Sequence, residues 1–155
     1  MLNRRRTLHL LAATALLPAA AARGQALPAM LVHKDPYCGC CNDWIDHVHA
    51  AGFTVEAIDT PDMTAVKTRL GVPMSLASCH TALIDGYVIE GHVPAASIHQ
   101  LLATRPAATG LAVPGMPLGS PGMEIPGQPA DTYDVILFAP TGTRTIARYQ
   151  GTRPI

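Results

Sequence analysis

The chain has 155 residues, of which 11 are basic and 11 acidic, and it contains four cysteines. This length suits one domain with its own hydrophobic core. The charge argues against binding to nucleic acid or anionic lipid, because residues 27–155 keep only seven basic side chains against eleven acidic ones and carry a net charge of about −4.

The N-terminus predicts an export signal. Residues 4–6 are arginines, and Leu8 to Ala22 is an apolar stretch rich in leucine and alanine. This order is typical of a secretory signal peptide, so we expect residues 1–26 to be removed and residues 27–155 to form one periplasmic domain. The adjacent arginines leave both the general secretory and the twin-arginine routes open. The apolar stretch is too short and too rich in alanine for a membrane span.

The first half of the exported chain predicts a βαβα order. An apolar run, Met30 to Lys34, is typical of a short strand, and a helical spacing of apolar residues follows from Cys40 to Ala51. Phe53 to Asp59 alternates as a second strand. Thr60-Pro61-Asp62 then begins a second helix, which we expect to continue through Leu70.

The next segment predicts a hairpin and a third helix. Thr81 to Ile84 and Tyr87 to Glu90 are joined by Asp85-Gly86, the dipeptide that most strongly favours a two-residue hairpin turn. Ala95 to Thr104 follows as a helix. A βαβα order followed by a hairpin and a helix is an α/β fold of the thioredoxin-like class.

Residues 106–129 differ in composition from the rest of the chain. They contain six prolines and five glycines, and the tripeptide Pro-Gly-Met occurs at residues 114–116 and again at 121–123. Because proline and glycine stiffen and shape loops, we expect an ordered loop in which the methionines have a function. The segments 133–138 and 143–149 then predict a closing β-hairpin.

Three of the four cysteines form the cluster Cys38-Gly39-Cys40-Cys41. Thiols crowded this tightly share a proton, a disulfide or a metal ion. A Cys40–Cys41 bridge is disfavoured, because neighbouring Cα atoms are about 3.8 Å apart and a relaxed disulfide needs roughly 4.4–6.8 Å. In an oxidising compartment, unpaired thiols persist when a metal holds them or when they take part in a redox cycle.

The chain offers the donor types that Cu(I) prefers, which are thiolate, thioether and imidazole. Because the segment that enters the third strand of a thioredoxin-like fold faces the active cysteines, we expect Cys79 or His80 to approach Cys38. His33 and His92 are further candidates. Zinc is the alternative metal. The predicted ligands are Cys38, Cys40, Cys41, Cys79, His80, Met116 and Met123.

Each of these interpretations has a structural alternative. The four cysteines could form two disulfides, in which case one clustered cysteine pairs with Cys79. The two loop methionines could fill gaps in the core. His80 could be a polar residue with its hydrogen bonds satisfied at the start of a strand. His47, His49 and His99 are expected on solvent-exposed faces of helices, and His47 lies about 10 Å along its helix from Cys40, too far to share one metal with it.

Several uncommon motifs occur together and in order over most of residues 30–150. They are Tyr37-Cys38-Gly39-Cys40-Cys41, Gly71-Val72-Pro73, Ser78-Cys79-His80-Thr81, Tyr87 to Pro94, and Gly110 to Glu124. In these motifs the chain resembles the CopG-like exported metal-binding proteins, a domain of unknown function associated with copper resistance. The resemblance implies a thioredoxin-like fold, a periplasmic location, copper at the Cys-x-Cys-Cys cluster and a redox role toward copper.

The leading hypothesis is therefore a periplasmic protein of copper homeostasis that holds Cu(I), as a single ion or as a multinuclear cluster, and cycles its redox state. One alternative is a thiol-disulfide oxidoreductase with Cys38 as nucleophile and Cys41 as resolving thiol. Another is a chaperone that delivers copper to a periplasmic copper-handling partner.

Overall fold

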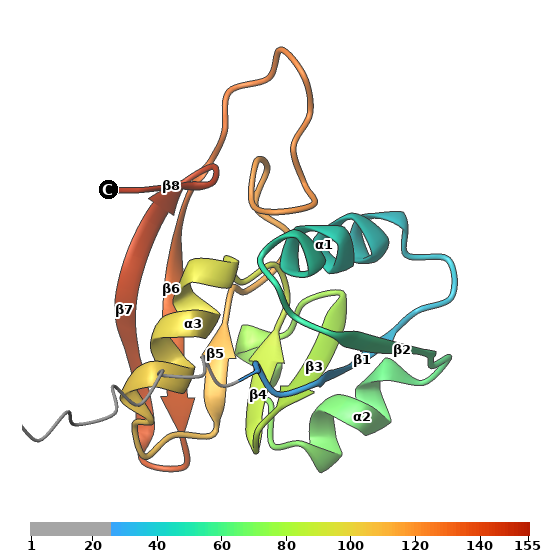
Figure 1. Ribbon diagram of the computed structural model, residues 1–155, viewed down its shortest axis with the longest axis vertical. Helices are drawn as coiled ribbons and strands as arrows, with labels where there is room; N and C mark the ends of the chain where they lie inside the picture. The colour runs from blue at the N-terminus through green and yellow to red at the C-terminus, as the bar shows by residue number, and fades with distance from the viewer. Residues whose placement is uncertain (1–25) are drawn as a thin grey trace, which may run out of the picture.

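The computed structural model describes residues 26–155, and the predicted signal peptide lies outside the described residues except for Ala26. Within this range the fold is mixed α/β, with three α-helices and one sheet of eight strands in the order β2-β1-β3-β4-β5-β6-β7-β8 (Figure 1). None of the described helices combines the length and the apolar character that crossing a membrane would require.

The first half of the domain has the predicted βαβα order. The four elements are β1 (Met30–Lys34), α1 (Gly39–Ala50), β2 (Val55–Asp59) and α2 (Met63–Arg69). Strand β1 pairs in parallel with β2, as a strand–helix–strand crossover requires. Helix α2 begins where the side chain of Asp62 accepts the backbone N–H of Ala65, which satisfies one of the free donors of its first turn.

The predicted hairpin and third helix are also confirmed. Strand β3 (His80–Ile84) pairs antiparallel with β4 (Tyr87–Glu90) and with β1, and α3 (Ala95–Thr104) follows. The sequence did not indicate the short 3-10 helix η1 (Met74–Leu76) that precedes β3. This turn of helix brings the chain to the start of β3.

The proline- and glycine-rich segment is more regular than its composition predicts. Residues Gly110–Ala112 form β5, which pairs in parallel with β4 and antiparallel with β6 (Thr132–Ala139). A Cβ atom at Gly110 would lie 1.7 Å from the carbonyl oxygen of Val88, so only glycine allows the two strands to approach this closely. Three residues are too few to give a strand pattern in the sequence.

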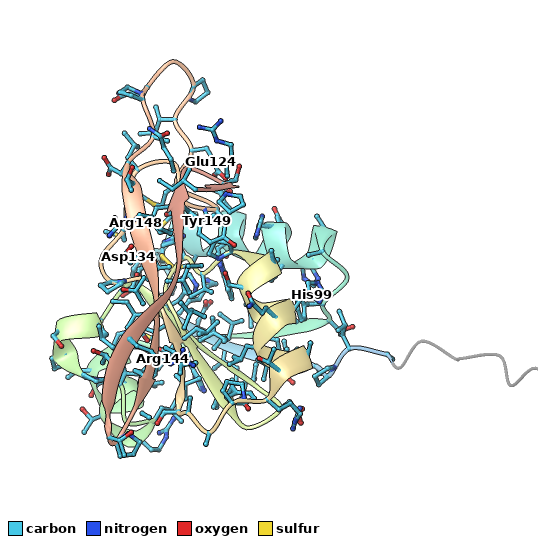
Figure 2. All side chains as sticks on the ribbon, turned by 90° about the vertical axis from the view of Figure 1, so that its left-hand side faces the viewer. His99, Glu124, Asp134, Arg144, Arg148 and Tyr149 are labelled. Carbon is cyan, nitrogen blue, oxygen red and sulfur yellow. A yellow bond between two sulfur atoms is a disulfide. The ribbon has the colours of Figure 1, made fainter. Side chains whose placement is uncertain are left out.

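The closing hairpin is longer than predicted. Strand β6 pairs with β7 (Gly142–Gln150), and a two-residue strand β8 (Arg153–Pro154) completes the sheet. Asp134 and Arg148 face each other across β6 and β7, and Nε of Arg148 donates to Oδ1 of Asp134 at 2.7 Å (Figure 2). This pair lies on the exposed side of the hairpin.

Two hydrophobic clusters cover the two faces of the sheet. The larger one includes Trp44 of α1 and Ile98 of α3, so these helices share one face, and Ile89 of β4 belongs to it. Val88, the neighbour of Ile89, belongs to the smaller cluster with Val72. Side chains of a strand alternate between faces, so α1 and α3 lie opposite the segment that leads from α2 to η1.

Candidate metal centre

A short turn presents the cysteine cluster at the start of α1. Strand β1 ends at Lys34, and the backbone N–H of Tyr37 donates to the side chain of Asp35 while that of Cys38 donates to the carbonyl oxygen of Asp35. Cys38 is the N-cap residue of α1, and no side chain caps the helix. The cluster therefore lies at the positive end of the helix dipole.

The three clustered cysteines differ in state. Cys38 and Cys41 form a disulfide with their Cα atoms 5.4 Å apart, because residues three apart meet on one side of a helix. Cys40 and Cys79 are free thiols. The Sγ atom of Cys40 lies 3.5 Å from that of Cys38. These four cysteines therefore form one disulfide, and not the two structural disulfides of the alternative interpretation.

Cys79 joins the cluster from the start of β3. In the register of β1 and β3, Lys34 faces His80, so the residue before β3 lies beside the end of β1, where the cluster begins. The Sγ atoms of Cys38, Cys40, Cys41 and Cys79 all lie within 4.8 Å of one another. We call these four residues the sulfur group. The expectation that Cys79 approaches Cys38 is confirmed.

Cys79 also belongs to a second group, with His80 and His92, whose ligand atoms again lie within 4.8 Å of one another. We call these three residues the imidazole group. The Sγ atom of Cys79 is 3.0 Å from Nε2 of His92 and 3.3 Å from Nδ1 of His80. The two groups share one atom, so two metal positions could be bridged by a single thiolate.

His92 is absent from the set of predicted ligands, although it was kept as a further candidate. The signal that could have found it is the Asp85-Gly86 turn, which sets Ile84 opposite Tyr87 and Thr81 opposite Glu90. The same register, continued by two residues, brings Cys79 opposite His92. Extending the register of the hairpin beyond its last strand residues would have predicted that Cys79 and His92 lie opposite each other.

The hydrogen bonds of His92 fix its tautomer. Its Nδ1 lies 2.8 Å from the carbonyl oxygen of Pro121, which can only accept, so Nδ1 carries the proton and Nε2 presents a lone pair to Cys79. Burial lowers the pKa of His92, which keeps the ring neutral. Metal-binding histidines typically hold their second nitrogen in this way.

His80 is fully buried between two aromatic neighbours. Its ring centre is 4.3 Å from that of Trp44 and 5.1 Å from that of His92. Burial lowers its pKa well below the usual value, and His92 and Lys67 act in the same direction. Among the described residues, Nε2 of His80 has no hydrogen-bond partner. The prediction of a polar residue with its hydrogen bonds satisfied therefore does not describe this ring.

The thiol of Cys79 is held in its protonated form. Burial, followed by the neighbouring Cys40, raises its pKa to about 12. Two neutral imidazoles and a half-buried, protonated thiol make a site that does not attract a hydrated cation by charge. A soft ion that displaces the thiol proton gains a thiolate ligand.

A buried ion pair supports the residues that precede Cys79. The Oε1 atom of Glu90 accepts from Nζ of Lys67 and from the backbone N–H of Ser78, both at 2.6 Å, while Oε2 accepts from the hydroxyl of Thr81 at 2.7 Å. Burial raises the pKa of Glu90, and Lys67 acts in the opposite direction. The pair fixes the backbone that delivers Cys79 to the centre.

Both Pro-Gly-Met motifs are anchored against the centre. The N–H of Gly115 donates to the carbonyl oxygen of Ala77, and the hydroxyl of Ser78 donates to that of Gly115. At Gly122, a Cβ atom would lie 2.6 Å from the backbone nitrogen of Trp44 and 2.8 Å from the carbonyl oxygen of Cys40. The loop therefore lies on the first turn of α1 at one motif and on the Cys79 segment at the other.

The two loop methionines follow these anchored glycines directly. Met116 is 53% exposed, so it does not fill a gap in the core, and Met123 is half-buried. Next to Met123, Glu124 lies on the same loop (Figure 2). Its carboxylate accepts the N–H of Gly122 at 2.7 Å. Both thioethers remain candidate ligands.

Other histidines lie outside the two groups. His33 bonds with the hydroxyl of Thr60 at 3.1 Å. Of the three helix histidines predicted to be solvent-exposed, His49 is exposed, whereas the prediction is wrong for His47 and His99, which are half-buried. Nε2 of His47 accepts the N–H of Ala95 at the start of α3, and burial lowers its pKa. Trp44, one turn beyond Cys40, packs in the core.

Comparison with known proteins places the chain in a family. Residues 76–123 match the family described as "Protein of unknown function, DUF411", and this segment contains Cys79, His80, His92 and both loop methionines. No curated protein matches the chain.

Two solved structures are similar over most of the chain. One, described as form 1 of copper resistance protein copG, has 51% sequence identity and a TM-score of 0.75, and the match covers 81% of this chain and 99% of that one. Form 2 of the same protein has 50% identity and a TM-score of 0.74, with 79% and 98% covered. The chain therefore belongs to the DUF411 family of CopG-like copper resistance proteins.

Proposed function

We propose that the protein is a periplasmic copper-binding protein that holds Cu(I) in the sulfur and imidazole groups and acts in copper resistance. The observation that carries this proposal is the position of Cys79, whose sulfur belongs to both groups. A soft ion in this position meets thiolates on one side and imidazole nitrogens on the other. These are the ligand types that Cu(I) prefers.

The number of metal ions follows from the same arrangement. Four sulfurs and two imidazoles are more donors than one Cu(I) ion uses, and thiolates readily bridge neighbouring ions. Several ions also relieve the repulsion between closely spaced thiolates. We therefore propose a multinuclear copper cluster with Cys79 as a bridging ligand, to which Met116 and Met123 add thioether donors from the anchored loop.

Copper is favoured over zinc on two grounds. A group of four cysteine sulfurs would also suit a tetrahedral zinc ion. The neighbouring imidazole group and the two thioethers extend the donor set beyond what a closed zinc site uses, and thioether is a soft ligand. The solved relatives are described as copper resistance proteins, which supports the same choice.

The fold and the location complete the proposal. The order β1-α1-β2-α2-β3-β4-α3, with α1 and α3 on one face, supports a thioredoxin-like core to which β5 to β8 are added. We assign residues 1–26 as an export signal, and we place the mature protein in the periplasm because of that signal. Copper cycling between Cu(I) and Cu(II) at the cluster belongs to the same proposal.

Metal titration tests this function. The purified protein, reduced and then freed of reductant under anaerobic conditions, is titrated with Cu(I) in competition with a chromophoric Cu(I) chelator, and separately with zinc. We expect more than one Cu(I) per chain, a loss of copper in Cys40→Ser, and displacement of zinc by copper. Stoichiometric zinc that copper does not displace would contradict the proposal.

A second function is favoured by the Cys38–Cys41 disulfide itself. A Cys-x-x-Cys bridge at the start of a helix is the arrangement that thiol-disulfide oxidoreductases use. An insulin-reduction assay distinguishes the two functions. Turnover that is indifferent to copper and persists in Cys40→Ser would favour the oxidoreductase over the copper-binding protein.

A further inference from the structure

The two sulfurs of the disulfide differ in their access to solvent. Cys41 is fully buried, with 0% of its surface exposed, whereas Cys38 is half-buried. The surroundings of Cys38 are open, because Tyr37 is 94% exposed and a Cβ atom at Gly39 would meet nothing within 4 Å. A molecule that approaches from solvent therefore reaches Cys38 and not Cys41.

Thiol-disulfide exchange depends on this access. A thiolate attacks one sulfur of a disulfide, forms a mixed disulfide with it and expels the other sulfur as a thiolate. In this protein an external thiolate can attack only Cys38, so Cys41 is the sulfur that leaves. The expelled thiolate stays inside the sulfur group, within 4.8 Å of Cys40 and Cys79.

The internal thiols cannot open the bridge without outside electrons. Cys40 is close enough to attack, with its sulfur 3.5 Å from that of Cys38. Such an exchange produces a Cys38–Cys40 bridge and a free Cys41, so the number of disulfides in the chain is unchanged. Two more thiolates appear in the sulfur group only when an external reductant supplies two electrons.

The disulfide removes two metal donors from the sulfur group and leaves the donors of the imidazole group unchanged. Cys38 and Cys41 supply two of the four sulfurs of the sulfur group, and neither belongs to the imidazole group. With the bridge closed, Cys79, His80 and His92 are all still available. The oxidised protein therefore keeps one complete three-ligand position, whereas the thiolate-rich position is incomplete.

We propose that the Cys38–Cys41 disulfide is a gate for copper loading, which an exported dithiol reductant opens by attacking Cys38. The inference rests on the proposed copper-binding function. With the gate closed, copper binds at the imidazole group, and with the gate open, the two released thiolates add the sulfur group to the site.

The opening reaction balances as an exchange between two dithiols. The first thiolate of the partner forms a mixed disulfide with Cys38 and releases Cys41 as a thiolate. The second thiolate of the partner then attacks the partner's own sulfur in that mixed disulfide and releases Cys38. The partner ends as a disulfide, oxidised by two electrons, and Cys38 and Cys41 end as the reduced pair.

The site of attack is tested on the oxidised wild-type protein. Reduced glutathione serves as the probe thiol, the reaction is stopped with an alkylating agent, and fragmentation mass spectrometry locates the glutathione. We expect glutathione on Cys38 in at least about a tenfold excess over Cys41. Equal labelling of the two sulfurs, or labelling mainly at Cys41, overturns the direction of attack.

Single-cysteine variants check the same point without the disulfide. One keeps only Cys38, through Cys40→Ser, Cys41→Ser and Cys79→Ser, and the other keeps only Cys41, through Cys38→Ser in place of Cys41→Ser. Both variants are incubated with glutathione disulfide after circular dichroism has shown that they fold, and we expect the Cys38 variant to be modified much faster than the Cys41 variant. The wild-type labelling decides the question if either variant does not fold.

The gate itself is tested by counting copper in the oxidised and the reduced wild-type protein. Both are loaded anaerobically with Cu(I) in the absence of thiols, and oxidised His92→Ala is the third sample. We expect the reduced protein to hold at least about twice the copper of the oxidised one, and the copper of the oxidised protein to be lost in His92→Ala. Equal copper in both states contradicts the gate alone, whereas no copper in either contradicts the proposed function as well.

Discussion

The Sγ atom of Cys79 lies 3.0 Å from Nε2 of His92, although the two residues stand at the outer ends of β3 and β4 and belong to neither strand. The Asp85-Gly86 turn, four pairs of strand residues away, sets the register that brings them together. Because Cys79 also contacts the cysteines of α1, this one thiol connects the hairpin to the helix. The centre is therefore assembled from three separate segments of the chain.

Replacing His92 with alanine should weaken copper binding. The substitution removes a neutral nitrogen that already points at Cys79, together with the hydrogen bond that orients it to Pro121. We expect the Cu(I) affinity to fall at least about tenfold, as measured by competition with a chromophoric chelator. His33→Ala is the matched control, because His33 lies on β1, outside both ligand groups, and its side chain bonds with the hydroxyl of Thr60. Equal losses in the two variants would remove His92 from the site.

The sequence predicts much of this structure, because local patterns determine it. Helices α1 and α3 and the hairpin β3–β4 follow from apolar spacing and from one Asp-Gly turn, and they appear close to their predicted bounds. The approach of Cys79 to Cys38 agrees with the expectation for a thioredoxin-like order of elements, and in the structure it follows from the pairing of β1 with β3. The two helices and the hairpin can each be predicted from a short stretch of the sequence.

The remaining features depend on contacts between distant segments. Strand β5 exists because Gly110 lets the chain pass close to Val88, and three residues carry no periodicity. The burial of His80 between Trp44 and His92 requires side-chain packing in three dimensions, whereas the pairing of Cys38 with Cys41 is the one that the oxidoreductase alternative names. The burial of His47 against the start of α3 is another tertiary contact that helical spacing alone does not reveal.

Gly122→Ala should destabilise the protein and disturb the centre. Gly122 has a φ of +83°, and an added Cβ would meet the backbone of Trp44 at 2.6 Å. Gly127→Ala is the control, since Gly127 has a φ of +80° and nothing within 4 Å. We expect urea unfolding to show a loss of about 1 kcal/mol for Gly127→Ala, from backbone strain, and at least about 2 kcal/mol for Gly122→Ala. Equal losses would mean that the loop is not held against α1.

The buried pair of Lys67 and Glu90 should be strongly coupled in stability. Removal of either partner leaves the other charge buried without compensation, so Lys67→Met and Glu90→Gln should each cost about 3 kcal/mol or more. The double variant should cost less than the sum of the two, with a coupling of at least about 1 kcal/mol in a urea-unfolding cycle.

The exposed pair of Arg148 and Asp134 is the control for this cycle. Because solvent screens these charges, Arg148→Met should lower the free energy of unfolding by much less than either substitution at the buried pair. The account would be contradicted if the losses of unfolding free energy in Lys67→Met and Glu90→Gln simply added in the double variant. It would also be contradicted if either single loss were no larger than that of Arg148→Met. Either result would show that the buried pair does not stabilise the segment before Cys79.

The metal-free protein should lose stability as the pH falls below 6.5. The pKa values of His47, His80 and His92 are all lowered by burial, so the unfolded chain takes up protons that the folded protein does not. The stabilisation is fully present above pH 6.5 and is lost on acidification. His80, whose ring is fully buried, should contribute to this loss as the pH falls through the pKa of the unfolded chain. Urea unfolding at pH 7 and at pH 5.5 measures this loss, which should be smaller in His80→Gln; an unchanged loss there would contradict the burial of a neutral ring.

The most direct measurement of the central claim is an anomalous-scattering map at the copper absorption edge, from crystals of the reduced, Cu(I)-loaded protein. If Cys79 bridges the sulfur and imidazole groups, copper peaks should lie within about 2.3 Å of its sulfur, with at least one of them also bonded to Nε2 of His92. Copper found only at sites that exclude Cys79, or no copper bound to the cysteines at all, would contradict the account.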